Sequence, residues 1–313
     1  MAISQALRYV REAYELGMRE CLLSGGDPLR YPYLVDLVRN IKNMDAAIFV
    51  FINSVGENLT YEQAIDILNA GLGAWNFSVD TLDAKIYDEI RGVRGGLMRV
   101  LDAFNIIRCI REEHTNYHGL WINFMAVLTR HNYRTLPKLF RFSIENKVSS
   151  IFLMNVYGDN NFGRHLLSVE QIREFRSSTI PEILDVLESS DVDRCVIENA
   201  RTVLSEYFSS CNSDENYASG IWWKDFESVR CTCRVPDYHA MIGADGNVLP
   251  CCLIEIAHEG IVGNVNCHSL DEVWNGSSFE KFRRERIPFC QKCSAPLHRT
   301  IGLVPEMCRQ FDG

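Results

Sequence analysis

The stretch Cys21-Leu22-Leu23-Ser24-Gly25-Gly26-Asp27-Pro28-Leu29 decides how the first half of this chain is interpreted. Its apolar start predicts a short buried strand, and the Gly-Gly-Asp-Pro turn ends that strand. Apolar residues then recur at helical spacing over residues 34–41, which predicts a helix. A strand, a tight loop and a helix in this order form one β/α module.

The same module recurs along the first 156 residues. Further strands are predicted at residues 47–52, 75–79, 120–128 and 151–156, and helices at residues 96–114 and 136–146. Thr60 and Gln63 have the spacing of a capping box, which predicts the start of another helix. Connections this short favour parallel strands with right-handed crossovers. The array opens on a helix at residues 3–14, whereas a barrel or open sheet normally starts with a strand.

The composition is that of a water-soluble globular protein. The 313 residues are 47% hydrophobic and 23% charged, which suits one large domain and a smaller one. The longest purely apolar run, residues 46–52, is far shorter than the roughly 20 residues that cross a bilayer. A net charge of −9 argues against non-specific nucleic-acid binding. We therefore expect a cytoplasmic protein with no nucleic-acid or membrane partner, and interpret the basic residues of 281–286 as a solvated helix face.

Four of the twelve cysteines have the spacing of a metal site. Cys233 and Cys251 flank a turn that contains Gly246, and Cys290 and Cys293 form a Cys-x2-Cys pair. Four thiolates suit a tetrahedral zinc ion or an iron–sulfur cluster, and this spacing fits either. A disulfide framework is less favoured because nothing at the start of the chain indicates export.

The composition changes at residue 231, where cysteines become dense and Gly, Asn and Asp mark frequent turns. We expect three regions: an array of β/α modules at residues 1–165, a helical bridge at 166–230 and a cysteine-rich domain at 231–313. A domain as small as the last is expected to depend on its metal for stability.

Several of these motifs resemble those of the radical S-adenosylmethionine (SAM) superfamily. The resemblance rests on the Gly25-Gly26-Asp27-Pro28 loop, on Ser-x-Asp within residues 77–83, and on Arg91-Gly92. The cysteine-rich segment, with Gly-x4-Cys, Gly263-Asn-Val265 and Cys-x2-Cys, resembles the SPASM/twitch extension of these enzymes, which holds an auxiliary cluster. The resemblance implies a partial (β/α)6 TIM-like barrel that lacks its first strand, followed by a small SPASM/twitch domain.

The resemblance also implies roles for individual residues. The candidates for SAM binding are Gly25, Gly26, Asp27, Asn53, Ser78, Asp80 and Arg91. The candidates that line a substrate site are Asn123, Asn155 and Tyr157. Two structural alternatives stay open: a satisfied core hydrogen bond for Asn123 and a surface salt bridge for Arg91.

The resemblance further implies that Cys233, Cys251, Cys290 and Cys293 hold one auxiliary 4Fe-4S cluster. Cys231 and Cys252 adjoin the motif cysteines and could replace them, and Cys308 is a possible late ligand. We prefer Cys233 and Cys251, because only these two give both the Cys-x2-Pro context and the Gly-x4-Cys context.

One family motif is absent from the 313 residues. The Cys-x3-Cys-x2-Cys set, which holds the SAM-cleaving 4Fe-4S cluster of the family, occurs nowhere in them. We expect that the first strand and its cluster loop were removed, or that this is a natural relative that lost them. Asp27 also stands where the family has Glu, which keeps the charge and shortens the side chain by one methylene.

Two functions follow as expectations. The first is a radical SAM oxidoreductase or lyase that abstracts hydrogen from a small polar metabolite, sugar- or nucleoside-like, or from a peptide. It would use SAM, a 4Fe-4S cluster and an external electron donor such as flavodoxin or ferredoxin. The alternative is a non-catalytic iron–sulfur or zinc protein of the same ancestry that acts as a binding module.

Overall fold

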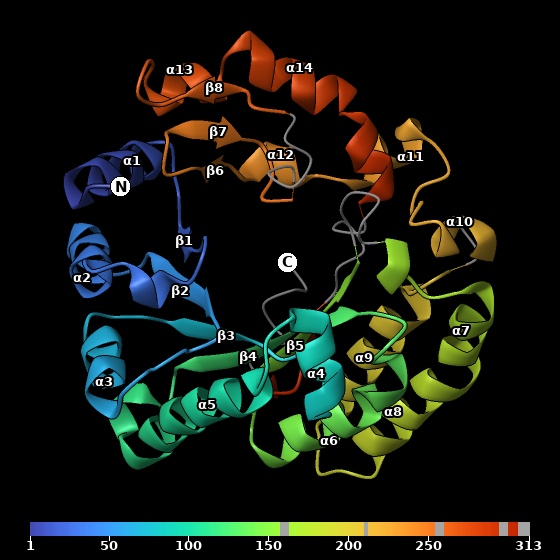
Figure 1. Cartoon of the computed structure of the whole chain (residues 1–313). Coiled ribbons are helices and arrows are strands. Elements are labelled where there is room, and N and C mark those ends of the chain that lie inside the picture. The colour runs from blue at the N-terminus through green and yellow to red at the C-terminus, as the bar shows by residue number, and fades with distance from the viewer. Residues whose placement is uncertain (157–162, 210–211, 254–259, 294–299, 306–313) are drawn as a thin grey trace. The chain divides into compact units, whose positions relative to one another are not determined.

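The computed structural model describes residues 1–156, 163–209, 212–253, 260–293 and 300–305. The chain forms two compact units, which are described separately (Figure 1). The barrel unit comprises residues 19–154, 173–207 and 299–313. The cysteine unit comprises residues 1–18, 155–172 and 208–298. The expected domain boundaries after residues 165 and 230 stay a prediction.

A mostly parallel six-stranded sheet organises the barrel unit, in the order β1-β2-β3-β4-β5-β9. Its strands are β1 (Glu20–Leu23), β2 (Phe49–Ser54), β3 (Ala74–Ser78), β4 (Trp121–Leu128), β5 (Ser150–Asn155) and β9 (Thr300–Gly302). Strands β1 to β4 pair in parallel, as the short β/α connections predict. The prediction of a partial TIM-like barrel is thereby confirmed.

Strand β9 is an addition that the sequence did not predict. It pairs antiparallel with β5, and Ile301, in its centre, is completely buried. A three-residue segment carries too little periodicity to be identified as a strand, so only its pairing with β5 reveals it.

One or more helices follow each of the strands β1 to β5. Their bounds are α2 (Leu34–Met44), α3 (Tyr61–Asn69), α4 (Ala84–Arg91), α5 (Gly96–Glu113), α6 (Leu136–Glu145), α8 (Ile180–Glu188) and α9 (Arg194–Glu206). Helix α7 (Val169–Glu174) runs into a π-helical turn, Phe175–Thr179, that leads to α8. The capping box of Thr60 and Gln63 is present at the start of α3.

Alternation along β2 separates two faces of the sheet. Val50 and Ile52 are completely buried, whereas the residues between them, Phe49, Phe51 and Asn53, are partly exposed. Successive side chains of a strand point to opposite faces, so the first set packs under the helices and the second lines the other face. Figure 1 shows α2, α3 and α5 along the outer side of the strands.

The cysteine unit contains a small antiparallel sheet and short helices. The sheet has the order β6-β7-β8, with β6 (Met241–Ile242), β7 (Asn247–Leu249) and β8 (Gly263–Asn264). The helices are α1 (Ile3–Glu15), α10 (Asp214–Ala218), α11 (Phe226–Thr232), α12 (Val235–Tyr238), α13 (Leu270–Trp274) and α14 (Ser277–Glu285).

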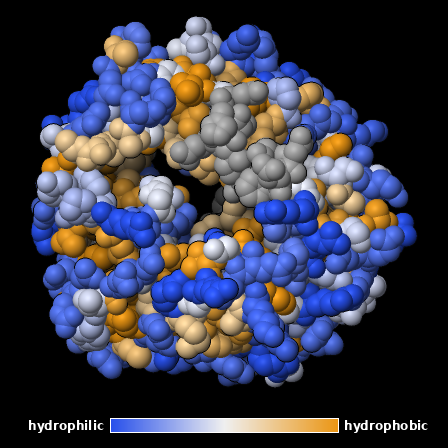
Figure 2. Space-filling view, in the orientation of Figure 1, coloured by the Kyte–Doolittle hydropathy of each residue, from blue (hydrophilic) through white to orange (hydrophobic). Residues whose placement is uncertain are grey.

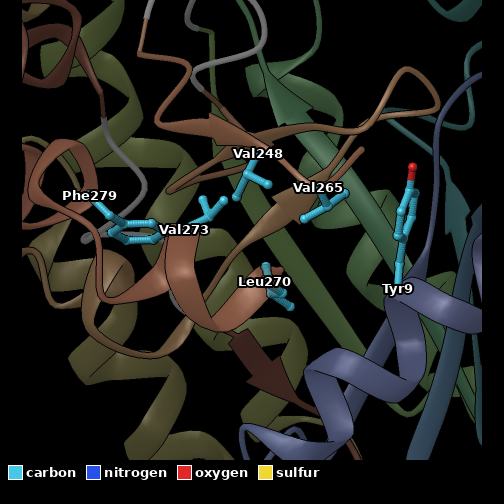
Figure 3. Packing of buried hydrophobic residues seen from close by; sticks show 6 residues of the cluster. All are labelled: Tyr9, Val248, Val265, Leu270, Val273 and Phe279. Atoms are coloured by element: carbon cyan, nitrogen blue, oxygen red, sulfur yellow. The ribbon is translucent and has the colours of Figure 1, made fainter. Parts of the chain in front are cut away.

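Helix α1, the first element of the chain, packs within the cysteine unit. Tyr9 belongs to a buried cluster with Val248, Val265, Leu270, Val273 and Phe279 (Figure 3). Polar contacts reinforce the packing, since Tyr9 Oη donates to Asn266 Oδ1 at 2.7 Å and the Leu270 amide donates to Glu12 at 2.7 Å. Segments more than 250 residues apart in the sequence thus share one core.

None of the helices in the described ranges is both long and apolar enough to cross a bilayer. Figure 2 shows hydrophilic residues over most of the visible face, with hydrophobic residues scattered among them.

Candidate functional site

The Gly25-Gly26 loop after β1 presents open backbone. Both glycines have positive φ, +100° and +57°, which side-chain-bearing residues rarely adopt. A Cβ built on either one would meet no atom within 4 Å. The loop therefore leaves room for a ligand to approach the main chain.

Asp27 holds the glycine loop against the end of β2. Its carboxylate accepts hydrogen bonds from the Leu29 amide at 3.0 Å, from the Ser54 hydroxyl at 2.8 Å and from the Val55 amide at 3.2 Å. A carboxylate offers about four acceptor positions, so these contacts use most of its capacity. The expected pairing of Asp27 with the ammonium group of a ligand stays a prediction, and the structure adds this positioning role.

Three asparagines and a serine form a ladder across four strands. Asn53, Asn76 and Asn123 are paired in register on β2, β3 and β4. The Ser150 hydroxyl donates to Asn123 Oδ1 at 2.9 Å, Asn123 Nδ2 donates to Asn76 Oδ1 at 2.8 Å, and Asn76 Nδ2 donates to Asn53 Oδ1 at 2.8 Å. Asn123 is thus satisfied by hydrogen bonds in the core, which was the alternative to a role in lining a substrate site.

At one end of the ladder, a side-chain amide donor has no partner among the described residues. Asn53 is half-buried, and its Nδ2 donates to no residue in the described part of the chain. Asn76, in the centre, was not among the predicted site residues. Its signal was a polar residue between Trp75 and Phe77 in an otherwise apolar strand.

Asp80 and Arg91 form an ion pair beyond the end of β3, in which the carboxylate is buried and the arginine reaches the surface. Asp80 is completely buried, and its two oxygens accept from Arg91 Nε at 2.6 Å and from the Val127 amide at 2.8 Å. Burial would lower the pKa of Arg91, but the charge and hydrogen bond of Asp80 outweigh it and raise that pKa. The pair fixes Arg91, and no described residue accepts from its two terminal nitrogens.

The remaining barrel candidates are placed as follows. Ser78 ends β3, and its carbonyl accepts from the Tyr87 hydroxyl at 3.0 Å. Asn155 ends β5 with a buried side chain. Tyr157 lies outside the described residues.

The four predicted cysteine ligands line a single cavity in the cysteine unit. Its other lining residues are Val229, Pro236, Leu253, Phe282, Arg286 and Phe289. Trp223 helps to position the second pair, because its Nε1 donates to the Cys293 carbonyl at 2.6 Å. The apolar lining raises the pKa of the Cys290 thiol to about 11 and that of Cys233 in the same direction, since burial disfavours the thiolate. Only a strongly bound metal would keep such thiols deprotonated at neutral pH.

A zinc ion and a 4Fe-4S cluster need their four cysteine sulfurs at different spacings. A Zn–S bond of about 2.3 Å in tetrahedral geometry requires sulfurs about 3.8 Å apart. Across the described ranges, no three His, Cys, Asp or Glu side chains are close enough to hold one ion. In a 4Fe-4S cluster each thiolate binds a different iron, so the ligands stand around a larger group.

The alternative cysteine ligands are placed elsewhere. Cys231 and Cys252 are exposed and do not line the cavity, and the Cys231 thiol contacts Glu227 at 3.3 Å. Cys308 lies outside the described residues.

The interpretation of residues 281–286 as a solvated helix face is wrong for Arg283, which packs over Trp274 and Phe279, and for Arg286. Lys281 and Arg284 are exposed, but Arg286 is only 8% exposed and lines the cysteine cavity. It lies just beyond the last turn of α14, where the chain bends inward, so helical spacing did not reveal its burial.

Sequence comparisons match both parts of the chain to known families. Residues 1–142 match the model of the radical SAM superfamily, and residues 231–294 match that of the SPASM iron–sulfur cluster-binding domain. The chain is 25% identical over 203 residues to the GTP 3′,8-cyclase of Clostridium perfringens, which is 65% of this chain and 56% of that protein. It is 24% identical over 288 residues to the PqqA peptide cyclase of Xanthomonas oryzae, which is 91% of this chain and 69% of that protein.

Among solved structures, Streptococcus suis SuiB bound to S-adenosylmethionine has a similar fold. The TM-score is 0.64 at 17% identity, and the match covers 95% of this chain and 64% of SuiB. The chain therefore spans less than two thirds of the length of both the cyclase and SuiB. The two family matches assign S-adenosylmethionine and an iron–sulfur cluster as cofactors, which agrees with the open glycine loop and the four-cysteine cavity. This chain belongs to the radical SAM superfamily and carries a SPASM-type iron–sulfur domain.

Proposed function

We propose that this chain is part of a radical SAM oxidoreductase or lyase that modifies a peptide, with one auxiliary 4Fe-4S cluster on Cys233, Cys251, Cys290 and Cys293. The observation that carries the proposal is the convergence of these four cysteines on one apolar cavity, in a chain that also has the glycine loop. Reduced flavodoxin or ferredoxin would be the electron donor.

When bound together, SAM and a reduced catalytic cluster supply a 5′-deoxyadenosyl radical that removes hydrogen from the substrate. The protein's part is to bind and orient. The Gly25 and Gly26 main chain would lie against SAM, and the free terminal nitrogens of Arg91 suit its carboxylate. The unpaired Asn53 Nδ2 suits an acceptor of SAM or substrate. Asp27 and Asp80 keep the loop and the guanidinium in place.

The fraction of this chain that each alignment covers favours a peptide substrate. The match to the PqqA peptide cyclase covers 91% of this chain and so includes the cysteine unit, whereas the match to the GTP cyclase covers 65%. A small polar metabolite of the sugar or nucleoside type remains the other substrate class of the proposal, since the GTP cyclase acts on a nucleotide.

A second candidate is a non-catalytic binding protein. The observation in its favour is that the 313 residues contain no Cys-x3-Cys-x2-Cys set. A catalytic cluster needs such a set with one open iron site, and the four cysteines of the cavity are all committed to the auxiliary cluster.

The test begins with the gene. The codons upstream of Met1 are sequenced, and the protein is produced both as the present 313 residues and with any upstream in-frame extension. After anaerobic reconstitution and reduction, 5′-deoxyadenosine is measured by mass spectrometry. We expect it only from the extended protein, and stimulation by peptides encoded beside the gene but not by GTP. An extended protein that holds two clusters and never forms 5′-deoxyadenosine would establish the binding-protein candidate.

A further inference from the structure

Arg286 is a buried cation at the wall of the four-cysteine cavity. It is only 8% exposed, and it is the one charged residue among the described residues that line this cavity. A buried guanidinium normally has a carboxylate or another anion as its partner, because removing the charge from water is costly. No carboxylate in the described ranges is paired with Arg286.

The hydrogen bonds of the guanidinium leave one of its three nitrogens, Nε, without a partner. Nη1 donates to the Phe282 carbonyl at 3.0 Å and also contacts the Arg283 carbonyl. Nη2 donates to the Cys233 carbonyl at 2.7 Å, which ties Arg286 to the backbone of a predicted cluster ligand. Nε is buried and has no hydrogen-bond partner.

The backbone of Arg286 is strained. Its φ of 63° and ψ of −178° fall in a region that is populated almost only by glycine. Such conformations persist where the surrounding structure demands them, and they gather at functional sites. Here the conformation turns a long cationic side chain off the end of α14 and against the cavity.

A 4Fe-4S cluster bound in the cavity would be a negatively charged partner for this cation. Four thiolates around a 4Fe-4S core carry a net negative charge in both oxidation states of the cluster, and the rest of the described lining is uncharged.

We propose that Arg286 donates a hydrogen bond from Nε to a thiolate or sulfide of the auxiliary cluster and raises the reduction potential of that cluster. Arg286 is thus a positioning and tuning residue, not a ligand. The inference rests on the proposed function, because it requires an iron–sulfur cluster at the four cysteines. One electron from the external donor adds one negative charge to the cluster, and a neighbouring cation stabilises the reduced form more than the oxidised form.

The test uses the 313-residue chain, reconstituted anaerobically with iron and sulfide. Iron content and the midpoint potential, followed by electron paramagnetic resonance, are measured for the wild type, Arg286→Met and Arg286→Lys. We expect Arg286→Met to lower the equilibrium constant for reduction about tenfold, which is about 59 mV for one electron. Arg286→Lys keeps the charge and should shift the potential less. The matched control is Arg284→Met, because Arg284 is exposed on the same helix and pairs with Glu285; it should leave the potential unchanged.

Two further measurements separate the tuning role from a structural one. Arg286→Gly removes the side chain but relieves the positive φ, so it should lower the potential as Arg286→Met does. A wild-type potential in Arg286→Gly or Arg286→Met would overturn the inference.

If these variants do not hold a cluster, the wild-type protein labelled with ¹⁵N-arginine supplies the test. Pulsed electron paramagnetic resonance should detect a ¹⁵N nucleus coupled to the reduced cluster. A spectrum without this coupling would reject the hydrogen bond. A wild type that binds zinc and no iron would refute the cluster itself, and with it the proposed function.

Discussion

Asp27 and Arg286 show how single side chains gain a second role from their surroundings. The carboxylate of Asp27 is the N-terminal cap of the short 3-10 helix Pro28–Arg30 and also the acceptor for Ser54 on the neighbouring strand. It therefore determines the shape of the glycine loop, whatever it contributes to a ligand. Arg286 joins the end of α14 to the backbone of Cys233 in the same way.

Replacing Asp27 should loosen the glycine loop. Asp27→Ala leaves the hydroxyl of Ser54, which is 4% exposed, and two backbone amides without their acceptor. An unsatisfied buried polar group costs about 1–3 kcal/mol, so the free energy of unfolding in urea should fall by about that amount. SAM affinity, measured by calorimetry, should fall with it. Asp36→Ala is the control, since Asp36 forms only an exposed pair with Arg39. Equal effects of the two substitutions would contradict the positioning role.

His239 should make the cysteine unit sensitive to mild acid. Burial lowers the pKa of His239 from its usual 6.5, and its Nε2 is buried without a hydrogen-bond partner. As the pH falls through about 6.5, His239 is protonated in the unfolded chain before it is protonated in the folded chain. The free energy of unfolding therefore falls from that pH down to the pKa of His239 in the folded state. His239→Gln should flatten this dependence below about pH 6.5. Thermal unfolding at a series of pH values checks it, and an unchanged slope in the variant would exclude His239 as the cause.

At the scale of elements, the asparagine ladder links strands β2 to β5 through side chains. Parallel strands in register bring Asn53, Asn76 and Asn123 to the same level, and each amide can both donate and accept. The ladder therefore adds a directional row of hydrogen bonds to the backbone ladder of the sheet. It ends at the free donor of Asn53.

Asn76→Ala should destabilise the sheet strongly. The substitution removes two hydrogen bonds and leaves Asn53 Oδ1 and the buried Asn123 Nδ2 unpaired. At about 1–3 kcal/mol for each unsatisfied group, the free energy of unfolding should fall by at least about 2 kcal/mol. Asn40→Ala is the control, because Asn40 is exposed and donates only to the Asp36 carbonyl. The double substitution Asn76→Ala/Asn123→Ala should cost less than the sum of the two single changes; additive losses would mean that the ladder is not a connected unit.

At the scale of the whole molecule, the cysteine unit is assembled from distant parts of the chain. Helix α1 supplies Tyr9 to the core of a sheet and helix that follow residue 240 (Figure 3). Because of this long-range packing, α1 and the cluster residues between Val248 and Phe279 stabilise each other.

Loss of the metal should therefore destabilise helix α1. Removing the cluster with a chelator under reducing conditions is expected to increase amide hydrogen exchange in α1 as well as in β6 to β8, because these elements share one core. Tyr9→Ala should produce the same pattern at constant metal content and lower the free energy of unfolding by about 3–5 kcal/mol. Protection of α1 that is independent of both changes would argue against a common core.

The sequence by itself determined the local elements and the chemistry of the ligands. Helical spacing, apolar strand runs and the capping box of Thr60 and Gln63 depend on near neighbours, so they predicted most of the β/α array. The cysteine spacing selected Cys233, Cys251, Cys290 and Cys293 because thiolates on tight turns suit a metal.

Only the tertiary structure decided what pairs across long distances. It showed that Asp27 is engaged by Ser54, that Asn123 belongs to a ladder, that β9 joins β5, and that Arg286 lies inside the cavity. Each of these facts depends on contacts between segments far apart in the chain or on a backbone bend such as the positive φ of Arg286. Periodicity records which face of an element is apolar, but it carries no information about the partner that the face or its polar side chains will meet.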